Sequence, residues 1–128
     1  MRRSAAAVMA VALGLSTIAV ASPAWAEPPG CSHGYPDIYE ESPGYMTAYG
    51  SGSCSASETR TFRVEIKRDV SGLPDPVVSS YDDRHTGMSY YAETSSCDGG
   101  RNAKYYGRTF FTSSPTYKDS PHITVNTC

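Results

Sequence analysis

The chain has 128 residues, with 11 Lys and Arg against 13 Asp and Glu, and hydrophobic residues make up 39% of it. This length suits one small domain with a limited core. The acidic excess argues against a nucleic-acid partner, because phosphate binding relies on basic residues concentrated on one face.

Residues 1–26 have the three parts of a secretory signal peptide. A head with two arginines precedes an apolar run, and Ala24-Trp25-Ala26 is a small-residue cleavage site. The alternative, a membrane anchor, is disfavoured because the run is shorter than the ~20 residues that a bilayer span needs. We therefore expect a secreted, extracellular product that begins at Glu27 and has no membrane partner.

All four cysteines follow the predicted signal peptide: Cys31, Cys54, Cys97 and Cys128. An even number of cysteines in a small exported chain predicts two disulfides. A metal site is the competing interpretation, but the cysteines lack the paired spacing of metal ligands, so we expect no metal and no cofactor. The sequence leaves three pairings open. We favour Cys31–Cys54 and Cys97–Cys128, because the second would tie the last strand to an earlier one.

Residues 27–44 are rich in proline and glycine and show no apolar periodicity. They predict an extended or irregular N-terminal arm, pinned to the body of the protein at its cysteine. The prolines should limit how well this arm pairs with the protein's own sheet.

Tyrosines and carboxylates alternate in and just after this arm. Tyrosine is enriched at protein interfaces, because it offers a wide contact area at a low entropy cost. We therefore predict a partner-binding set that consists of Tyr35, Asp37, Tyr39, Glu40 and Tyr45. The alternative is that these tyrosines cover a small core.

The strongest strand signal lies at residues 59–68, where Phe62, Val64 and Ile66 alternate with charged residues. Shorter strands are predicted at 45–49, 77–81, 88–94, 104–112 and 122–127. With five to seven strands and no helical periodicity, residues 45–128 predict an all-β fold. The expected architecture is a small antiparallel β-sandwich of the Ig-like or Greek-key type.

Three segments are predicted to interrupt these strands. The sequence Gly50-Ser51-Gly52-Ser53 should end the first strand, and the polar residues 82–87 should form a loop. The glycines of Asp98-Gly99-Gly100 could belong to a phosphate-binding loop, but such a loop precedes a helix, and here a strand pattern follows. We therefore predict a hairpin connection at this position.

The chain contains no recognisable catalytic motif. His33, His85 and His122 are the candidate bases, and no G-x-S-x-G sequence accompanies them. Asp83 and His85 lie in the densest polar segment, which we interpret as a solvated loop. We expect a non-enzymatic protein without catalytic residues.

Two further functions compete with partner binding. The segment Gly72-Leu73-Pro74-Asp75-Pro76 could serve as the exposed, proline-stiffened loop of an inhibitor of an extracellular hydrolase. A membrane-active toxin is disfavoured, because the chain has a negative balance and no basic amphipathic helix.

Several features resemble those of small secreted β-sandwich proteins of high-GC Gram-positive bacteria. These features are the signal peptide, the four cysteines, the strand TFRVEIKRD leading into SGLPDPVV, and the turn SSCDGG before YYGRTFF. In size and plan the chain is also similar to the small adaptor subunit of umbrella toxins, which joins a lectin-like subunit to a large toxin-bearing one. The resemblance covers most of residues 31–128 as a layout. It implies a connector whose residues 27–49 engage a secreted protein partner.

Overall fold

The computed structural model describes residues 27–114 and 116–126; the predicted signal peptide and Cys128 lie outside them. The described strands are β1 (Cys31–His33), β2 (Asp37–Ser42), β3 (Tyr45–Arg68), β4 (Val77–Ser96), β5 (Ala103–Phe111), β6 (Lys118–Asp119) and β7 (Ile123–Val125). A short 3₁₀ turn, η1 (Asp98–Gly100), precedes β5. The predicted all-β class is therefore confirmed.

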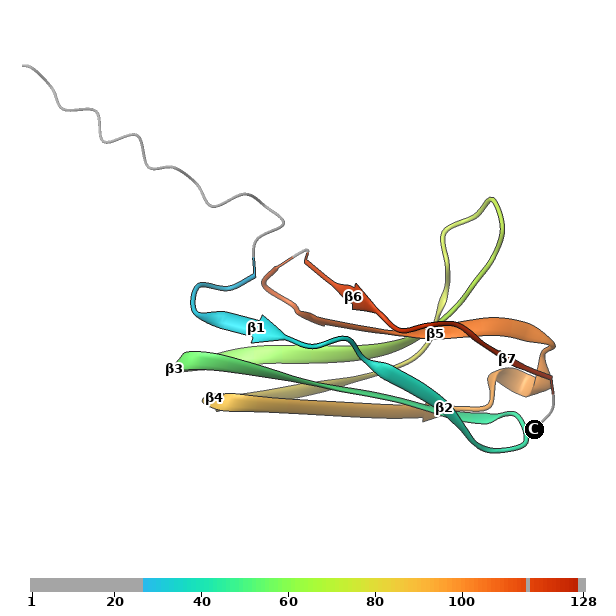
Figure 1. The fold of residues 1–128 in the computed structure, drawn as a ribbon, viewed down its shortest axis with the longest axis horizontal. Coiled ribbons are helices and arrows are strands. Elements are labelled where there is room, and N and C mark those ends of the chain that lie inside the picture. The colour runs from blue at the N-terminus through green and yellow to red at the C-terminus, as the bar shows by residue number, and fades with distance from the viewer. Residues whose placement is uncertain (1–26, 115, 127–128) are drawn as a thin grey trace, which may run out of the picture.

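The seven strands belong to one antiparallel sheet that is organised around β3 (Figure 1). One edge of β3 pairs with β4 almost from end to end, which makes a long hairpin. The other edge of β3 pairs with β1 and β2 along its first half and with β5 along its second half. The short strands β6 and β7 pair with β5.

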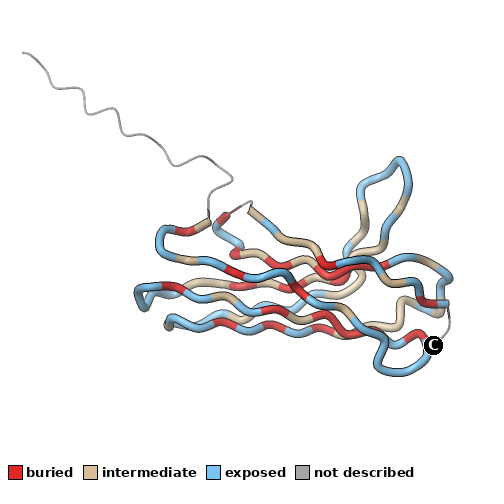
Figure 2. Tube along the Cα trace, in the orientation of Figure 1, coloured by how far each residue is buried: buried red, intermediate tan, exposed pale blue. Residues whose placement is uncertain are grey.

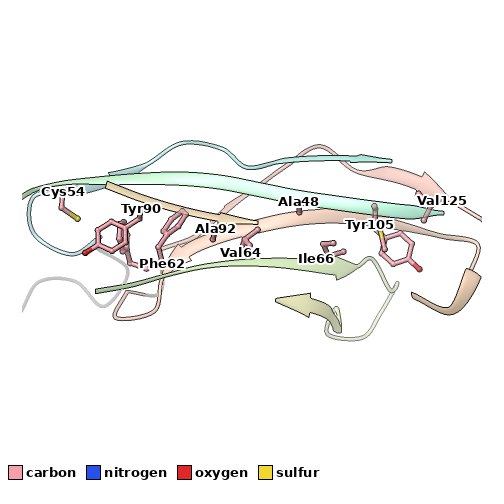
Figure 3. Packing of buried hydrophobic residues seen from close by; sticks show 11 residues of the cluster. Ala48, Cys54, Phe62, Val64, Ile66, Tyr90, Ala92, Tyr105 and Val125 are labelled. Carbon is pink, nitrogen blue, oxygen red and sulfur yellow. The ribbon is translucent and has the colours of Figure 1, made fainter. Parts of the chain in front are cut away.

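A bulge in the long hairpin curls this sheet over on itself. Residues 54–57 of β3 lie opposite Met88 alone, between the pairs Ser53–Ser89 and Glu58–Gly87. Extra residues on one strand bend it and increase its twist. The first half of β3 consequently lies over its second half and β5, and the core fills the space between them (Figure 3).

Alternation along the strands creates this core. Phe62, Val64 and Ile66 are fully buried, as their spacing predicts. Burial alternates with exposure along the paired strands in Figure 2. The buried hydrophobic cluster consists of Met46, Ala48, Cys54, Phe62, Val64, Ile66, Tyr90, Ala92, Tyr105, Phe111 and Val125.

Glycines allow the two halves of the curled sheet to approach closely. A Cβ atom on Gly50 would lie 2.6 Å from the Thr109 side chain, and one on Gly52 would lie 3.0 Å from the Phe111 ring. The expectation that residues 50–53 end a strand is therefore wrong. These glycines lie inside β3 because β5 covers them, which is one of the established uses of glycine within strands.

The polar segment at 82–87 is also part of a strand. Asp82 forms a two-point salt bridge with Arg63 of β3, and Asp83 accepts a hydrogen bond from the Tyr91 backbone N–H at 2.9 Å. The predicted loop is therefore wrong. Polar residues here occupy a strand whose side chains face water or protect its edge.

The connection at Asp98-Gly99-Gly100 is not a hairpin. Both glycines have positive φ, of 65° and 74°, as a tight turn requires. The strands on either side of this turn, β4 and β5, pair with opposite edges of β3 and not with each other. The turn therefore carries the chain from one edge of β3 to the other.

The N-terminal segment is extended and is part of the sheet. β1 pairs with residues 52–54 of β3, and β2 pairs with residues 45–49. The expectation that prolines keep this segment from pairing is wrong, because Pro36 lies between the two strands and Pro43 lies after them. Prolines at such positions remove no ladder hydrogen bond.

One predicted disulfide is present in the described residues. Cys31 and Cys54 are directly opposite each other in the β1–β3 pair and are bonded. The other predicted pair, Cys97–Cys128, includes a residue outside the described part of the chain.

A buried histidine makes the stability of this fold dependent on pH. Burial against the rings of Phe62 and Phe111 lowers the pKa of His33, and the nearby Glu27 carboxylate opposes this effect. Lys118 and the Thr109 backbone also face this imidazole. The unfolded chain binds a proton at His33 near pH 6.5, where the folded protein resists protonation.

The free energy of unfolding should therefore fall as the pH drops below about 6.5, by at most ~1.4 kcal/mol per pH unit, down to the folded-state pKa. Urea unfolding at pH 7.5 and pH 5 measures this loss. His33→Gln should reduce the dependence on pH, and His85→Gln at an exposed position should preserve it. An unchanged slope in His33→Gln would contradict the assignment.

Candidate functional site

Outward-facing side chains of three strands form a surface that we call the tyrosine face. Paired residues of neighbouring strands point to the same side of a sheet. The face comprises the outward residues of β2, the first half of β3 and the second half of β4: Asp37, Tyr39, Glu41, Tyr45, Tyr49, Ser51, Tyr91, Glu93 and Ser95. Thr47 has the same orientation on β3 but is 1% exposed, and its hydroxyl bonds to Glu41 and Ser95. Buried residues such as Met46, Ala48 and Ala92 alternate with them and point into the core.

Three tyrosine rings cross this face, one from each strand. The ring centroids of Tyr39 and Tyr49 are 6.1 Å apart at an interplanar angle of 71°, and those of Tyr49 and Tyr91 are 6.3 Å apart at 34°. Tyr39 is 43% exposed and Tyr91 is 52% exposed. The rings contact one another, so they form a continuous aromatic row with no opening between them.

Carboxylates hold the hydroxyl groups of this row. The Tyr49 hydroxyl donates to Asp37 Oδ2 at 3.2 Å, and the Tyr91 hydroxyl donates to Glu93 Oε2 at 2.7 Å. The hydrogen bond to Glu93 raises the pKa of Tyr91 to about 12, and that to Asp37 raises the pKa of Tyr49. The tyrosines therefore stay neutral at physiological pH, and the carboxylates supply the charge of the face.

These carboxylates have no cationic neighbour within the described residues. The tyrosine face contains no Lys or Arg, and no ion pair there involves Asp37, Glu41 or Glu93. The opposite outer surface is different. There Arg63 pairs with Asp82, and Arg108 pairs with Asp119.

The structure brings together only part of the predicted binding set. Asp37, Tyr39 and Tyr45 lie on the tyrosine face. Tyr35 is 76% exposed in the connection between β1 and β2, where its ring lies 5.4 Å from Lys118 Nζ. Glu40 is exposed, but it is paired with the buried Met46 and so points away from the face.

Sequence reasoning did not assign three central members of the face. Tyr49, Tyr91 and Glu93 all occupy outward positions of predicted strands, so alternation indicated their exposure. Their convergence depends on the order β2, β3, β4 across the sheet, which the sequence does not encode locally.

The connection between β3 and β4 is a separate, projecting feature (Figure 1). Asp75 anchors it, accepting hydrogen bonds from the Tyr106 hydroxyl at 2.6 Å and from the Val70 backbone N–H at 2.9 Å. The two hydrogen bonds lower the pKa of Asp75, and burial together with the hydrogen bond to Asp75 raises the pKa of Tyr106. Leu73 is 68% exposed on this connection.

The polar cluster on β4 has a structural explanation. His85 Nδ1 lies 2.7 Å from Asp83 Oδ1, and the other oxygen of Asp83 accepts the hydrogen bond from the Tyr91 backbone. The His85 ring also packs against Tyr90 at 4.5 Å. Within residues 27–114 and 116–126, no group of three or more His, Cys, Asp or Glu could hold a metal ion.

Comparisons with known proteins give no assignment for this geometry. No family model matches the chain, and no curated protein matches it. Kinship with a secreted adaptor subunit therefore stays a prediction. In the part of the chain that the structure describes, no helix is long and apolar enough to cross a membrane.

Proposed function

We propose that this protein is a secreted, non-enzymatic binding module that holds a partner protein on its tyrosine face. The observation that carries the proposal is the row of Tyr39, Tyr49 and Tyr91, in which the two outer rings are exposed and the central Tyr49 is half-buried. Cross-strand aromatic pairs stabilise a sheet by only roughly 0.2–1 kcal/mol each, whereas an interface uses exposed aromatic rings as anchors.

The composition of the face favours a protein over a small molecule. Tyrosine and serine are its main residue types besides the carboxylates, and both are enriched in antibody paratopes, where rigid aromatic side chains and adaptable hydroxyls provide the contacts. Small ligands are held in concave pockets. No pocket was found among the described residues, and a broad, shallow surface suits a macromolecule.

The proposal includes export and a second disulfide. The signal-peptide pattern of residues 1–26 supports cleavage after Ala26. Val125 at the end of β7 pairs with Ala103, which follows the turn that begins directly after Cys97. This pairing supports a Cys97–Cys128 bond, which would close the curled sheet as a two-layered, sandwich-like domain.

An adaptor role in an extracellular toxin complex is the specific form of the proposal. Its support is the resemblance in size and layout to the small adaptor subunit of umbrella toxins. A connector needs exposed surfaces on more than one side. Here the tyrosine face and the projecting connection at Leu73 lie on different parts of the sheet.

Affinity capture with matched variants tests the proposal. The tagged mature protein is incubated with the producer's culture supernatant, and the recovered proteins are identified by mass spectrometry. Tyr91→Ala should reduce recovery of a stoichiometric partner by roughly tenfold or more, as expected for an interface anchor. Tyr81→Ala is the control, because Tyr81 is 56% exposed on the same strand but lies outside the face.

Equal recovery by wild type and Tyr91→Ala would contradict the assignment of the face, and recovery of no partner would contradict the proposed function. Thermal unfolding by circular dichroism must show that both variants remain folded.

Inhibition of an extracellular hydrolase is a second candidate, favoured by the anchored connection at Asp75. An inhibitor loop must be held rigidly and exposed, and the two hydrogen bonds to Asp75 and the exposure of Leu73 meet both needs. Assays against a panel of proteases and glycosidases separate the candidates. Inhibition that Leu73→Ala abolishes would favour this second function, whereas an adaptor should inhibit none.

A further inference from the structure

The charge pattern identifies the chemistry of the partner, and we infer that a cationic, arginine- or lysine-bearing protein segment docks on the tyrosine face. This inference rests on the proposed function, because it assumes that the face is an interface. It adds which class of surface the face recognises.

The first observation is that charge is divided between two parts of the fold. Residues 27–59 and 85–100 contain seven carboxylates and no Lys or Arg. They supply β1, β2, most of the first half of β3 and the second half of β4, which together form the half of the sheet that bears the face. All nine Lys and Arg that follow Glu27 lie in the remaining segments, with six carboxylates.

Three of the seven carboxylates already have partners in this chain, Glu27 in His33, Glu58 in Arg60 and Asp98 in Arg68. Asp37, Glu41 and Glu93 form no ion pair among the described residues, so the face is negative and should steer cationic partners towards it.

The second observation is that the carboxylates of the face form no ion pair within the described residues, in contrast to Asp82 and Asp119. Asp82 and Asp119 accept two hydrogen bonds each from an arginine of this chain. Asp37 and Glu93 accept from tyrosine hydroxyls instead, which orient them without neutralising them. A carboxylate keeps further lone pairs after accepting one hydrogen bond, so both can still receive a guanidinium or ammonium group.

The third observation is an example of the expected contact within this protein. The guanidinium carbon of Arg108 lies 3.6 Å from the centroid of the Tyr117 ring, while the same side chain forms its salt bridge with Asp119. The pair Tyr91 and Glu93 offers the same two groups, an aromatic ring and a carboxylate, with no arginine between them. An arginine from a partner could therefore stack on Tyr91 and bind Glu93 together.

A second copy of this chain could supply that cation only from a basic residue outside the two-point salt bridges, such as the exposed Arg84 or Lys104. The strongly paired arginines on the opposite outer surface, Arg63 and Arg108, already bind Asp82 and Asp119. Using them in a dimer would break two-point salt bridges to form new ones. Self-association is nevertheless an outcome that the experiment detects.

Nuclear magnetic resonance titration of the mature protein tests the inference. The probes are two synthetic peptides, Ac-GRGRGRG-amide and its glutamate counterpart Ac-GEGEGEG-amide. We expect the arginine peptide to shift the backbone amide signals of residues 37–41, 47–51 and 91–95, with several-fold weaker binding when NaCl is raised from about 50 to 200 mM. The glutamate peptide should shift none of them.

Charge-removing variants of equal size provide the controls. Glu93→Gln should weaken binding of the arginine peptide several-fold, whereas Glu65→Gln, on the opposite outer surface, should leave it unchanged. Shifts spread over both outer surfaces, or equal binding by the two variants, would overturn the inference. Shifts that depend on protein concentration without peptide would assign the face to a second copy instead.

The result is separable from the test of the proposed function. Partner capture that needs Tyr91, combined with no response to the arginine peptide, would leave the binding function standing and overturn only the cationic partner. Loss of partner capture altogether would count against the binding function itself.

Discussion

Phe111→Ala is expected to lower the free energy of unfolding by about 3–5 kcal/mol, as truncation of a buried phenylalanine generally does. The Phe111 ring lies 5.1 Å from that of Phe62 and 5.5 Å from that of Tyr90. It also covers Gly52, so it contacts both halves of the curled sheet. Because domains are typically stable by only ~5–15 kcal/mol, this single truncation could unfold the protein at room temperature.

The neighbouring residue supplies the matched control. Phe110 is on the outer surface of β5, half-buried, with the Arg63 guanidinium carbon 5.9 Å from its ring centroid. Phe110→Ala should cost about 1 kcal/mol or less, the value of a surface cation–π contact. Urea unfolding is followed by far-ultraviolet circular dichroism, since the single tryptophan, Trp25, precedes Glu27. Equal losses in the two variants would contradict the curled arrangement of β3 and β5.

Removal of the Cys31–Cys54 bond is expected to lower the free energy of unfolding by roughly 3 kcal/mol. The bond closes a loop with a sequence separation of 23 residues. In the chain-entropy model, a loop of this length restricts the unfolded chain by about that amount. The bond also holds β1, a strand of three residues, against the bulged part of β3. We therefore expect residues 27–34 to lose amide-exchange protection before the rest of the sheet.

The measurement compares Cys31→Ala/Cys54→Ala with Ser32→Ala/Ser53→Ala. Ser32 and Ser53 are the adjacent opposed pair on the same two strands and are exposed. Their replacement should change the free energy of unfolding by less than ~0.5 kcal/mol. A cysteine double variant as stable as wild type would mean that pairing with β3, and not the covalent bond, fixes the N-terminal segment.

The fold and the proposed binding surface depend on the same structural device. The bulge at residues 54–57 turns the inner side of β3 onto β5. The first half of the long hairpin therefore has one face buried in the core and one face exposed to solvent. Gly50 and Gly52 permit the close approach of β5 on the buried face. The tyrosines at alternate positions of β3 then lie on the solvent-facing side, and β2 and β4 pair with the two edges of β3.

Local patterns in the sequence determined the all-β class of this protein and the inner faces of its most regular strands. Phe62, Val64, Ile66 and Val125 are buried where alternation predicts them, because a period of two is a property of each strand alone. The Cys31–Cys54 bond agrees with the favoured pairing. Glycines and polar residues usually interrupt strands, but this rule fails at positions where tertiary contacts stabilise the strand. Gly50 and Gly52 continue a strand because β5 covers them, and Asp82 does so because Arg63 binds it.

Only the tertiary structure decided which outward residues form a surface. Asp37 and Tyr39 come from β2, Tyr49 from β3, and Tyr91 and Glu93 from β4. The contact between Tyr49 and Tyr91 joins segments more than forty residues apart. Strand order and register set these contacts, and both depend on long-range pairing that no local pattern records. The sequence by itself determined the alternation that places these tyrosines and carboxylates on one side of their strands; the curl of one sheet around β3 decided that this side is the outer one and that they stand together without a basic residue among them.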